Sequence, residues 1–393
     1  MDIGLKYAIG CTSMPTLAST ASSIRGPVSM RDAEECCADD IVVLAEGGAM
    51  CSDSLGGEYR PSCEVVRKLC ADALQGSRCT SNVQIIVPDD GLVLSDDVTM
   101  DRIESFGQSL QAIFQQMRAK SVVVLAGSHK VPRYATAATL ALTPADLGVD
   151  THGSVSRESS GSLVIASTRY AANVDNNAAV DTMRDALQLS KHIGMKGRAA
   201  ALFDKKLYAL PGLSRPEDPT TLQSRFRPRA TKGDRTSWYF SERMQCDVPI
   251  GDGSPFLLDS GVRTFVFGGE SQHDPDGLIN AMWSDVRSKG VHGVVIKKAG
   301  NRHPLTSCDP DKLESIDRIG IPIIAVGDRN GETAKPRDVT GAYKNILDGS
   351  RLQSGEAKLL LAYWLKGAEA AGFRAVEDIV AFVRQKLEAY PFR

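Results

Sequence analysis

Short apolar runs alternate with amphipathic segments along the chain from residue 41 onwards. In the first half, the apolar runs that we expect to be strands are 41–45, 83–87, 122–126, 163–166 and 199–203. The segments between them with helical spacing of apolar residues are 63–74, 99–118 and 175–191. Apolar runs of strand length that alternate with helices indicate strands buried on both faces, which are typical of a parallel sheet. The pattern therefore predicts the α/β fold class.

A second, smaller series follows a region rich in proline and basic residues. Its expected strands are 264–267, 293–297 and 322–326, and its expected helices are 276–289, 310–318, 354–371 and 376–389. Prolines between the two series interrupt regular structure and indicate a linker or a long excursion. We expect an N-terminal extension at 1–40, a large α/β domain at 41–210, a linker or excursion at 211–255 and a small C-terminal α/β domain at 256–393.

Composition and charge exclude several classes of function. Lys plus Arg number 46 against 48 Asp plus Glu, a balance that does not indicate a nucleic-acid-binding protein. No apolar run approaches the roughly 20 residues of a membrane-spanning helix, so we expect no membrane association. Seven of the nine cysteines lie in the first 79 residues without a CxxC spacing, which favours reduced thiols in a cytoplasmic protein. We expect no metal and no cofactor, because His and Cys lack the spacing of metal ligands.

The most informative motif follows the first of these strands. The run from Ile41 to Ala45 ends at Glu46, and Gly47 and Gly48 come directly after it. In open α/β sheets, ligands bind beyond the carboxyl ends of the strands, where glycine lets the backbone approach closely. The sequence therefore predicts a ligand site at this turn.

The order and spacing of motifs over about residues 41–390 resemble those of the bacterial-type L-asparaginases. The segment Glu46-Gly-Gly-Ala-Met50 stands where that family has Thr-Gly-Gly-Thr-Ile, and Tyr59 stands at the place of the tyrosine in its mobile lid. The other matching positions are Ser95 and Asp96 at the place of the substrate-binding pair, Gly127-Ser128-His129 at the place of Gly-Thr-Asp, and Asn301 in the Gly-Asn pair. The resemblance implies a two-domain asparaginase-like fold.

The same resemblance implies an altered active site. In the family, a threonine hydroxyl on the first turn attacks the substrate amide, whereas Ala49 offers only a methyl group. Ser128 keeps the hydroxyl of the second threonine, and His129 replaces the aspartate. The position of the catalytic lysine falls on Ile193, next to Lys191 and His192.

The candidate residues follow from these matches. For catalysis they are Tyr59, Ser128 and His129; for substrate binding Gly48, Ala49, Ser95, Asp96 and Asn301; and for possible support Lys191 and His192. Three alternative interpretations concern other residues or roles. Cys51 could replace the lost nucleophile, the segment 151–154 could be the true His-Gly-Thr motif, and Ser95 and Asp96 could cap the helix that begins near Thr99.

Three functions stay open on the sequence. The first is a repurposed enzyme that acts on a small polar metabolite by proton transfer, as a lyase, isomerase or cyclase, with little or no L-asparaginase activity. The second is an amidohydrolase acting on a non-asparagine amide or ester, in which Ser128 attacks and His129 or His192 is the base. The third is a non-catalytic relative that binds a ligand. Asn301 resembles a residue that completes a neighbouring subunit's site, so we expect a homodimer or homotetramer.

Overall fold

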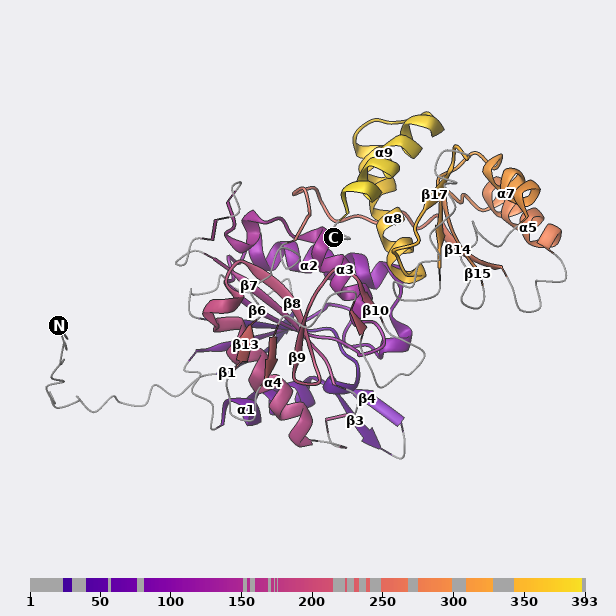
Figure 1. Ribbon diagram of the computed structural model, residues 1–393. Helices are drawn as coiled ribbons and strands as arrows, with labels where there is room; N and C mark the ends of the chain where they lie inside the picture. Colours follow the sequence, from indigo (N-terminus) through magenta and orange to yellow (C-terminus); the bar gives the residue numbers. More distant parts are fainter. Residues whose placement is uncertain are drawn as a thin grey trace, which may run out of the picture.

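The computed structural model describes residues 24–29, 40–55, 58–75, 81–150, 154–155, 160–168, 171–172, 174, 176–214, 223–224, 230–232, 238–240, 249–267, 275–298, 309–327 and 343–390. The predicted α/β class is confirmed, because helices pack against two largely parallel sheets. Figure 1 shows the larger sheet with helices on both of its faces and the smaller sheet beside it. Among the described residues, no helix combines the length and the apolarity needed to cross a bilayer.

The larger sheet has nine strands. In spatial order they are β1 (Ile24–Ser29), β5 (Val83–Val87), β2 (Ile41–Ala45), β6 (Ser121–Leu125), β7 (Ser162–Ala166), β8 (Arg198–Phe203), β9 (Lys206–Ala209), β12 (Ala230–Lys232) and β13 (Trp238–Phe240). The pairs from β1 to β8 are parallel, and β9, β12 and β13 continue the sheet in antiparallel pairs. Every residue of β2, β5, β6 and β7 is buried, which explains why their sequences are apolar except at Gln84, Ser121 and Ser162.

Two pairs of helices cover this sheet. The helices α2 (Met100–Gln115) and α3 (Val131–Ala141) pack against Val42 and Leu44 of β2 on one face. On the other face, α1 (Cys63–Leu74) and α4 (Asn176–Lys191) pack in one cluster with Ile41 and Val43. Successive side chains of a strand point to opposite faces, so β2 contributes to both hydrophobic cores.

The smaller sheet consists of four parallel strands. They are β14 (Val262–Phe267), β15 (Gly293–Lys298), β16 (Ile323–Val326) and β17 (Ile346–Asp348), in that spatial order. The helices α5 (Pro275–Ser288) and α7 (Pro310–Asp317) cover one face. The helix α8 (Ser354–Ala370) covers the other face and also packs against α3, and α9 (Val376–Ala389) packs on α8. The helix α8 thus joins the two halves of the molecule.

Several short strands differ from the sequence prediction. The segment 1–40, predicted as an extension, contributes β1 at the edge of the large sheet, and the segment 211–255, predicted as a linker, contributes β12 and β13 to the opposite edge. Two small antiparallel pairs complete the structure: β3 (Ser52–Leu55) with β4 (Glu58–Pro61), and β10 (Leu213–Ser214) with β11 (Gln223–Ser224). Strands of two or three residues are too short to show a period, and they form by adding to an existing edge. We retain the two-domain division as a proposal, with β1, β12 and β13 counted in the larger domain.

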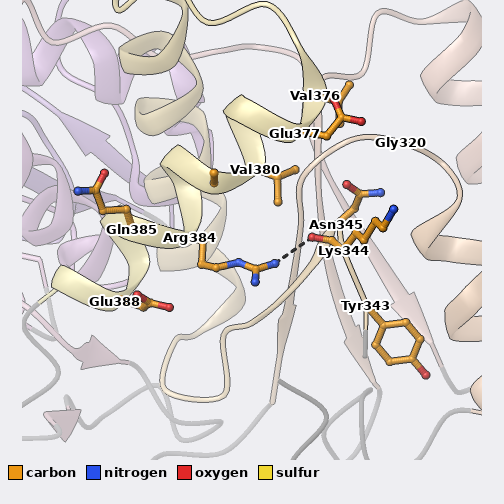
Figure 2. Close-up of a pocket in the computed structure, with 11 residues that line it drawn as sticks. Gly320, Tyr343, Lys344, Asn345, Val376, Glu377, Val380, Arg384, Gln385 and Glu388 are labelled. Atoms are coloured by element: carbon orange, nitrogen blue, oxygen red, sulfur yellow. Dashed lines mark hydrogen bonds between the residues drawn. The ribbon is translucent and has the colours of Figure 1, made fainter. Parts of the chain in front are cut away.

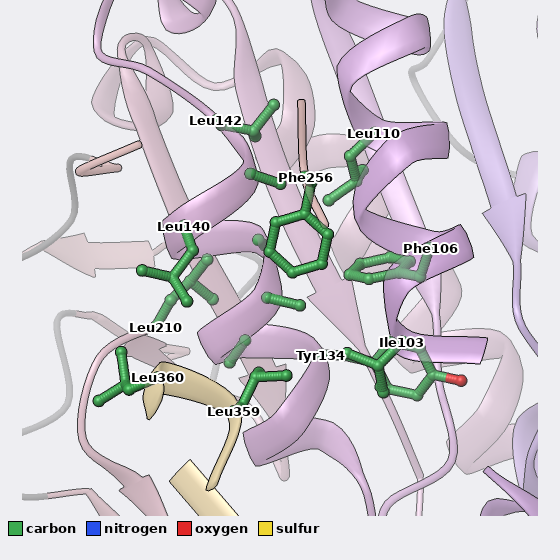
Figure 3. Close-up of a cluster of buried hydrophobic side chains, with 14 of the residues drawn as sticks. Ile103, Phe106, Leu110, Tyr134, Leu140, Leu142, Leu210, Phe256, Leu359 and Leu360 are labelled. Atoms are coloured by element: carbon green, nitrogen blue, oxygen red, sulfur yellow. The ribbon is translucent and has the colours of Figure 1, made fainter. Parts of the chain in front are cut away.

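The start of the predicted C-terminal domain also packs on the first one. Figure 3 shows the Phe256 ring among Phe106, Leu110 and Leu142, which come from α2 and the end of α3. A side chain at Gly107 would place its Cβ 2.1 Å from the Phe256 ring, so the absence of a side chain there makes room for this contact. The helix predicted at 99–118 ends at Gln115, and Arg118 takes a positive φ of 55°.

Candidate functional site

Three loops meet at the carboxyl ends of the parallel strands. The turn after β2 contacts the turn after β6, because a Cβ added to Gly48 would lie 2.2 Å from Gly127 Cα. Gly127 in turn lies against Ser95, whose Cβ would be 2.5 Å from a Cβ at position 127. Gly48 has a φ of +80°, which a residue with a side chain rarely adopts. The two glycines therefore allow three loops to approach each other more closely than side chains would permit.

This contact brings together most of the site residues predicted from the sequence. Ala49 begins a short 3₁₀ helix, η2 (Ala49–Cys51), and Ser128 follows Gly127; both are half-buried. His129 Nδ1 lies 3.5 Å from Asp96 Oδ1, a contact that is an ion pair when the imidazole is protonated; the two side chains are 45% and 85% exposed. The edge of the sheet thus carries a hydroxyl and an exposed carboxylate–imidazole pair beside the methyl group of Ala49.

Ser95 and Asp96 do not cap the following helix. They form another 3₁₀ helix, η3 (Ser95–Asp97), and the N-cap of α2 is Thr99, whose hydroxyl accepts a hydrogen bond from the Arg102 backbone N–H at 3.2 Å. Capping therefore does not account for the carboxylate of Asp96.

A buried ion pair lies directly beneath the first turn. Arg102 Nε donates to Glu46 Oε2 at 2.8 Å, and only 3% and 1% of the two side chains are exposed. Arg102 Nη1 also pairs with Asp90, Nη2 donates to the Gly91 carbonyl at 2.8 Å, and the Tyr134 hydroxyl donates to Glu46 Oε2 at 3.4 Å. Burial raises the pKa of Glu46 to about 7, although Arg102 opposes that shift. The network joins β2, α2, α3 and the loop after β5, so it fixes the base of the three-loop site.

Sequence reasoning missed this network. Glu46 and Arg102 are 56 positions apart, so no local spacing connects them. The signal that could have found them is a charge in an apolar context: Glu46 follows five apolar residues, and Arg102 lies on the face of α2 that also carries Phe106 and Leu110.

Two predicted site residues cannot be joined to this cluster by contacts. Tyr59 lies on β4 opposite Ser54 and is 39% exposed. The β3–β4 hairpin begins directly after η2, so the hairpin starts at the same edge of the sheet as the three-loop site. Asn301 lies outside the described residues, as does the segment 151–153 of the alternative His-Gly-Thr motif.

The predicted supporting residues Lys191 and His192 are placed elsewhere. The carbonyl of Ser190, just before them, accepts hydrogen bonds from the hydroxyls of Ser121 and Ser162, the first residues of β6 and β7. These residues are therefore at the amino ends of the strands, one strand length or roughly 15 Å from the site. This corrects the assignment of Lys191 and His192, and it removes Ile193 as the counterpart of the family's lysine.

Cys51 is not suited to replace the nucleophile. Its side chain is buried within the core under α1, and burial raises the pKa of the thiol well above its usual range. Reactive cysteines need an accessible thiolate, so this residue fits a structural role.

The structure also contains a cavity of about 660 Å³ in the smaller half. Figure 2 shows it between α9 and the residues that precede β17, with Arg384 donating a hydrogen bond to the Lys344 carbonyl at 2.9 Å. Asp317 holds its floor by accepting from the backbone N–H groups of Lys344 and Asn345. None of the predicted site residues lines this cavity.

Comparisons with solved structures identify the architecture. The structure aligns with a probable cytoplasmic L-asparaginase from Campylobacter jejuni at a TM-score of 0.63 and 12% identity, over 90% of this chain and 100% of that chain. It aligns with L-asparaginase I from Vibrio cholerae at a TM-score of 0.63 and 12% identity, over 89% and 98%. The chain has an asparaginase-like fold. No protein-family model and no curated protein sequence matches it, and at this identity the structural likeness establishes the asparaginase-like fold alone.

Proposed function

We propose that the protein is an asparaginase-fold enzyme that acts on a small polar metabolite by proton transfer, with little or no L-asparaginase activity. The observation that carries this proposal is the Asp96–His129 pair at the carboxyl edge of the sheet, beside a turn whose first residue after the glycines is Ala49. The reaction would be of the lyase, isomerase or cyclase type.

The chemistry of the side chains supports proton transfer over covalent hydrolysis. An imidazole is the side chain best suited to accept and return a proton near neutral pH, and a carboxylate 3.5 Å from its Nδ1 favours the tautomer with the proton on Nδ1, which leaves Nε2 to accept a proton. The Ser128 hydroxyl can donate a hydrogen bond to a substrate oxygen on which charge develops. The methyl group of Ala49 cannot attack a carbonyl carbon.

The alternative is an amidohydrolase in which Ser128 is the nucleophile. The half-buried hydroxyl of Ser128 at the site favours it. The placement of His192 at the other edge of the sheet leaves His129 as the base, and neighbouring residues in a chain rarely aim their side chains at each other. A non-catalytic ligand-binding protein is the third candidate and has no observation of its own in its favour.

We also propose a homodimer or homotetramer in the cytoplasm. The oligomer is supported by the resemblance of Asn301 to a residue that completes a neighbouring subunit's site. The cytoplasmic location is supported by the free thiols of Cys51, Cys63 and Cys70. Light scattering at micromolar concentration that shows a monomer would refute the oligomer.

The first test measures ammonia release from asparagine and glutamine. Loss of a nucleophile commonly lowers kcat by factors on the order of 10⁴–10⁶, so we expect turnover far below the ~10 s⁻¹ typical of enzymes. Ala49→Thr alone should not restore activity, because His129 stands where the proton-transfer set of the family has an aspartate. Ordinary asparagine turnover by the unmodified protein would contradict the proposal.

The second test detects proton transfer directly. Small polar metabolites are incubated with the protein in D₂O, and deuterium incorporation at carbon is followed by NMR. We expect exchange that His129→Gln abolishes and that Asp96→Asn and Ser128→Ala reduce, whereas the matched control Asp97→Asn leaves it unchanged. Hydrolysis of amides or esters that Ser128→Ala abolishes, without deuterium exchange, would establish the alternative.

A further inference from the structure

Four basic side chains gather where α3 meets α8 and β14. Lys130 is the N-cap of α3, Arg133 lies in its first turn, Lys358 lies in the second turn of α8, and Arg263 lies on β14, against which α8 packs. Figure 3 shows Leu359 and Leu360 of α8 close to Leu210 and Leu140 in the hydrophobic core. Lys358 precedes these two leucines and is half-buried, so it lies at the margin of that core.

The geometry places Arg133 over the start of α8. A Cβ at Gly355 would lie 3.6 Å from Arg133 Nε, and that guanidinium is the nearest group to it. Lys358 is three positions after Gly355 and therefore on the same face of the helix. The guanidinium and the ammonium group thus face the same small region.

No described carboxylate neutralises Arg133 or Lys358, since neither forms an ion pair or a side-chain hydrogen bond with the described part of the chain. The acidic residue nearest in sequence, Glu356, points elsewhere: its Oε1 accepts from the Gly212 N–H at 3.3 Å and from the Tyr390 hydroxyl at 3.0 Å. Asp96 is the acidic group that acts on Lys130, and it already pairs with His129.

This arrangement costs free energy in the protein alone. Partial burial lowers the pKa of both Arg133 and Lys358, and the positive charges of Arg133 and Arg263 lower that of Lys358 further. Charges taken from water without a counter-charge are retained in proteins mainly where a ligand or partner neutralises them.

The first turn of α8 adds to the positive potential. Its N-cap, Gln353, makes no side-chain capping hydrogen bond, and Ala357 is the first residue whose N–H is bonded within the helix. The backbone N–H groups of Ser354 and Gly355 therefore have no acceptor within the helix and lie in the region that Arg133 covers. The first turns of helices attract anions for this reason.

We propose that Arg133, Lys358 and the start of α8 form an oxyanion-binding site that takes the phosphate or carboxylate group of a small metabolite. Arg133 binds two oxygens of the group through its guanidinium, and Lys358 supplies a point charge from the other side. Lys130 and Arg263 add positive potential at the rim. Binding of the anion does not depend on any reaction at the Asp96–His129 pair.

Isothermal titration calorimetry with the full chain tests the site. The probes are inorganic phosphate and malonate, each titrated against sodium chloride at matched ionic strength. We expect saturable binding that weakens about tenfold or more in Arg133→Gln and in Lys358→Gln, because each variant removes one charged hydrogen-bond donor. Arg133→Lys should restore part of the affinity. The exposed residue Lys68 on α1 supplies the matched control Lys68→Gln, which should bind as the unmodified protein does.

The two probes distinguish the sources of the oxyanion. Saturable binding of phosphate alone assigns a phosphorylated metabolite, and saturable binding of malonate alone assigns an organic acid. Absence of saturable binding of both probes, or equal binding by both variants and the unmodified protein, would overturn the proposal. Dissociation of an oligomer in Arg133→Gln without anion binding would also overturn it, because the basic cluster would then pair with an acidic segment of a second copy.

Discussion

Two neighbouring residues of α3, Tyr134 and Arg133, each belong to a different cluster of buried or partly buried charge. The first cluster is neutralised by its own members, and the second consists of like charges. Tyr134 faces the Glu46–Arg102 pair beneath the first turn, where donors and acceptors converge and the net charge is small. Arg133 is one position earlier, about 100° around the helix, and faces the region of Lys358, where the described part of the chain supplies no counter-charge. One helix therefore supports a compensated and an uncompensated cluster within a single turn.

The difference separates a structural role from a binding role. A buried ion pair with further hydrogen bonds is complete within the chain, and breaking it leaves an isolated charge. A pair of like charges is neutralised only by a counter-charge, which the described residues do not supply here. Removing a charge should consequently lower the free energy of unfolding in the Glu46–Arg102 cluster and raise it in the Arg133–Lys358 cluster.

The largest expected effect is from Arg102→Met. This change leaves Glu46 without its cation in the core, and we expect the free energy of unfolding to fall by about 3–5 kcal/mol in urea denaturation. The control is Arg67→Met, which breaks the exposed Arg67–Glu64 pair on α1 and should lower the free energy of unfolding far less, because water screens both charges. Equal losses in the two variants would show that burial does not distinguish them.

The pH dependence of stability should reveal Glu46. Its pKa is about 7 in the folded chain against 4.5 for a glutamate in water, so the folded state keeps a proton that the unfolded state has already released. The stabilising contribution of Glu46 to the free energy of unfolding is fully present below about pH 4.5. It falls by up to about 3 kcal/mol as the pH rises through about 7.

Urea denaturation from pH 4 to 8 measures this loss. Glu46→Gln should flatten the slope between pH 4.5 and 7, whereas Glu377→Gln on α9 should leave it unchanged. An unaltered slope in Glu46→Gln would mean that Glu46 is ionised throughout this range.

The smallest expected effect is of the opposite sign. Arg133→Glu places a carboxylate opposite Lys358, so the free energy of unfolding should rise by roughly 0.5 kcal/mol at low salt without added phosphate. The same variant should lose phosphate binding. Lys68→Glu on α1 controls for net charge, and a destabilised Arg133→Glu would argue against repulsion at this junction.

The central strands and helices of the fold could be predicted because each is defined by its own residues. The run 41–45 is apolar at every position, the run 83–87 is apolar except at Gln84, and they form β2 and β5 with the predicted bounds. The strands β1, β12 and β13 escaped prediction, because they form only when an edge of the large sheet is already present.

The candidate site was partly predictable for a similar reason. Residues that follow parallel strands lie at one edge of a sheet, and the resemblance to the L-asparaginases grouped Ala49, Ser95 and Ser128 there. Lys191 and His192 were assigned to that edge by counting along the chain, although α4 ends at the opposite edge.

The amino-acid sequence by itself determined which segments become the central strands and the helices, and where glycines allow the loops to meet. These properties depend on periodicity and on backbone conformation, both of which are local. Only the tertiary structure decided which charges are neutralised: Glu46 meets Arg102 across 56 residues, and Arg133 meets Lys358 with no carboxylate of the described residues between them. Coulomb energy and desolvation depend on distances in space and on burial, and neither quantity is set by separation along the chain.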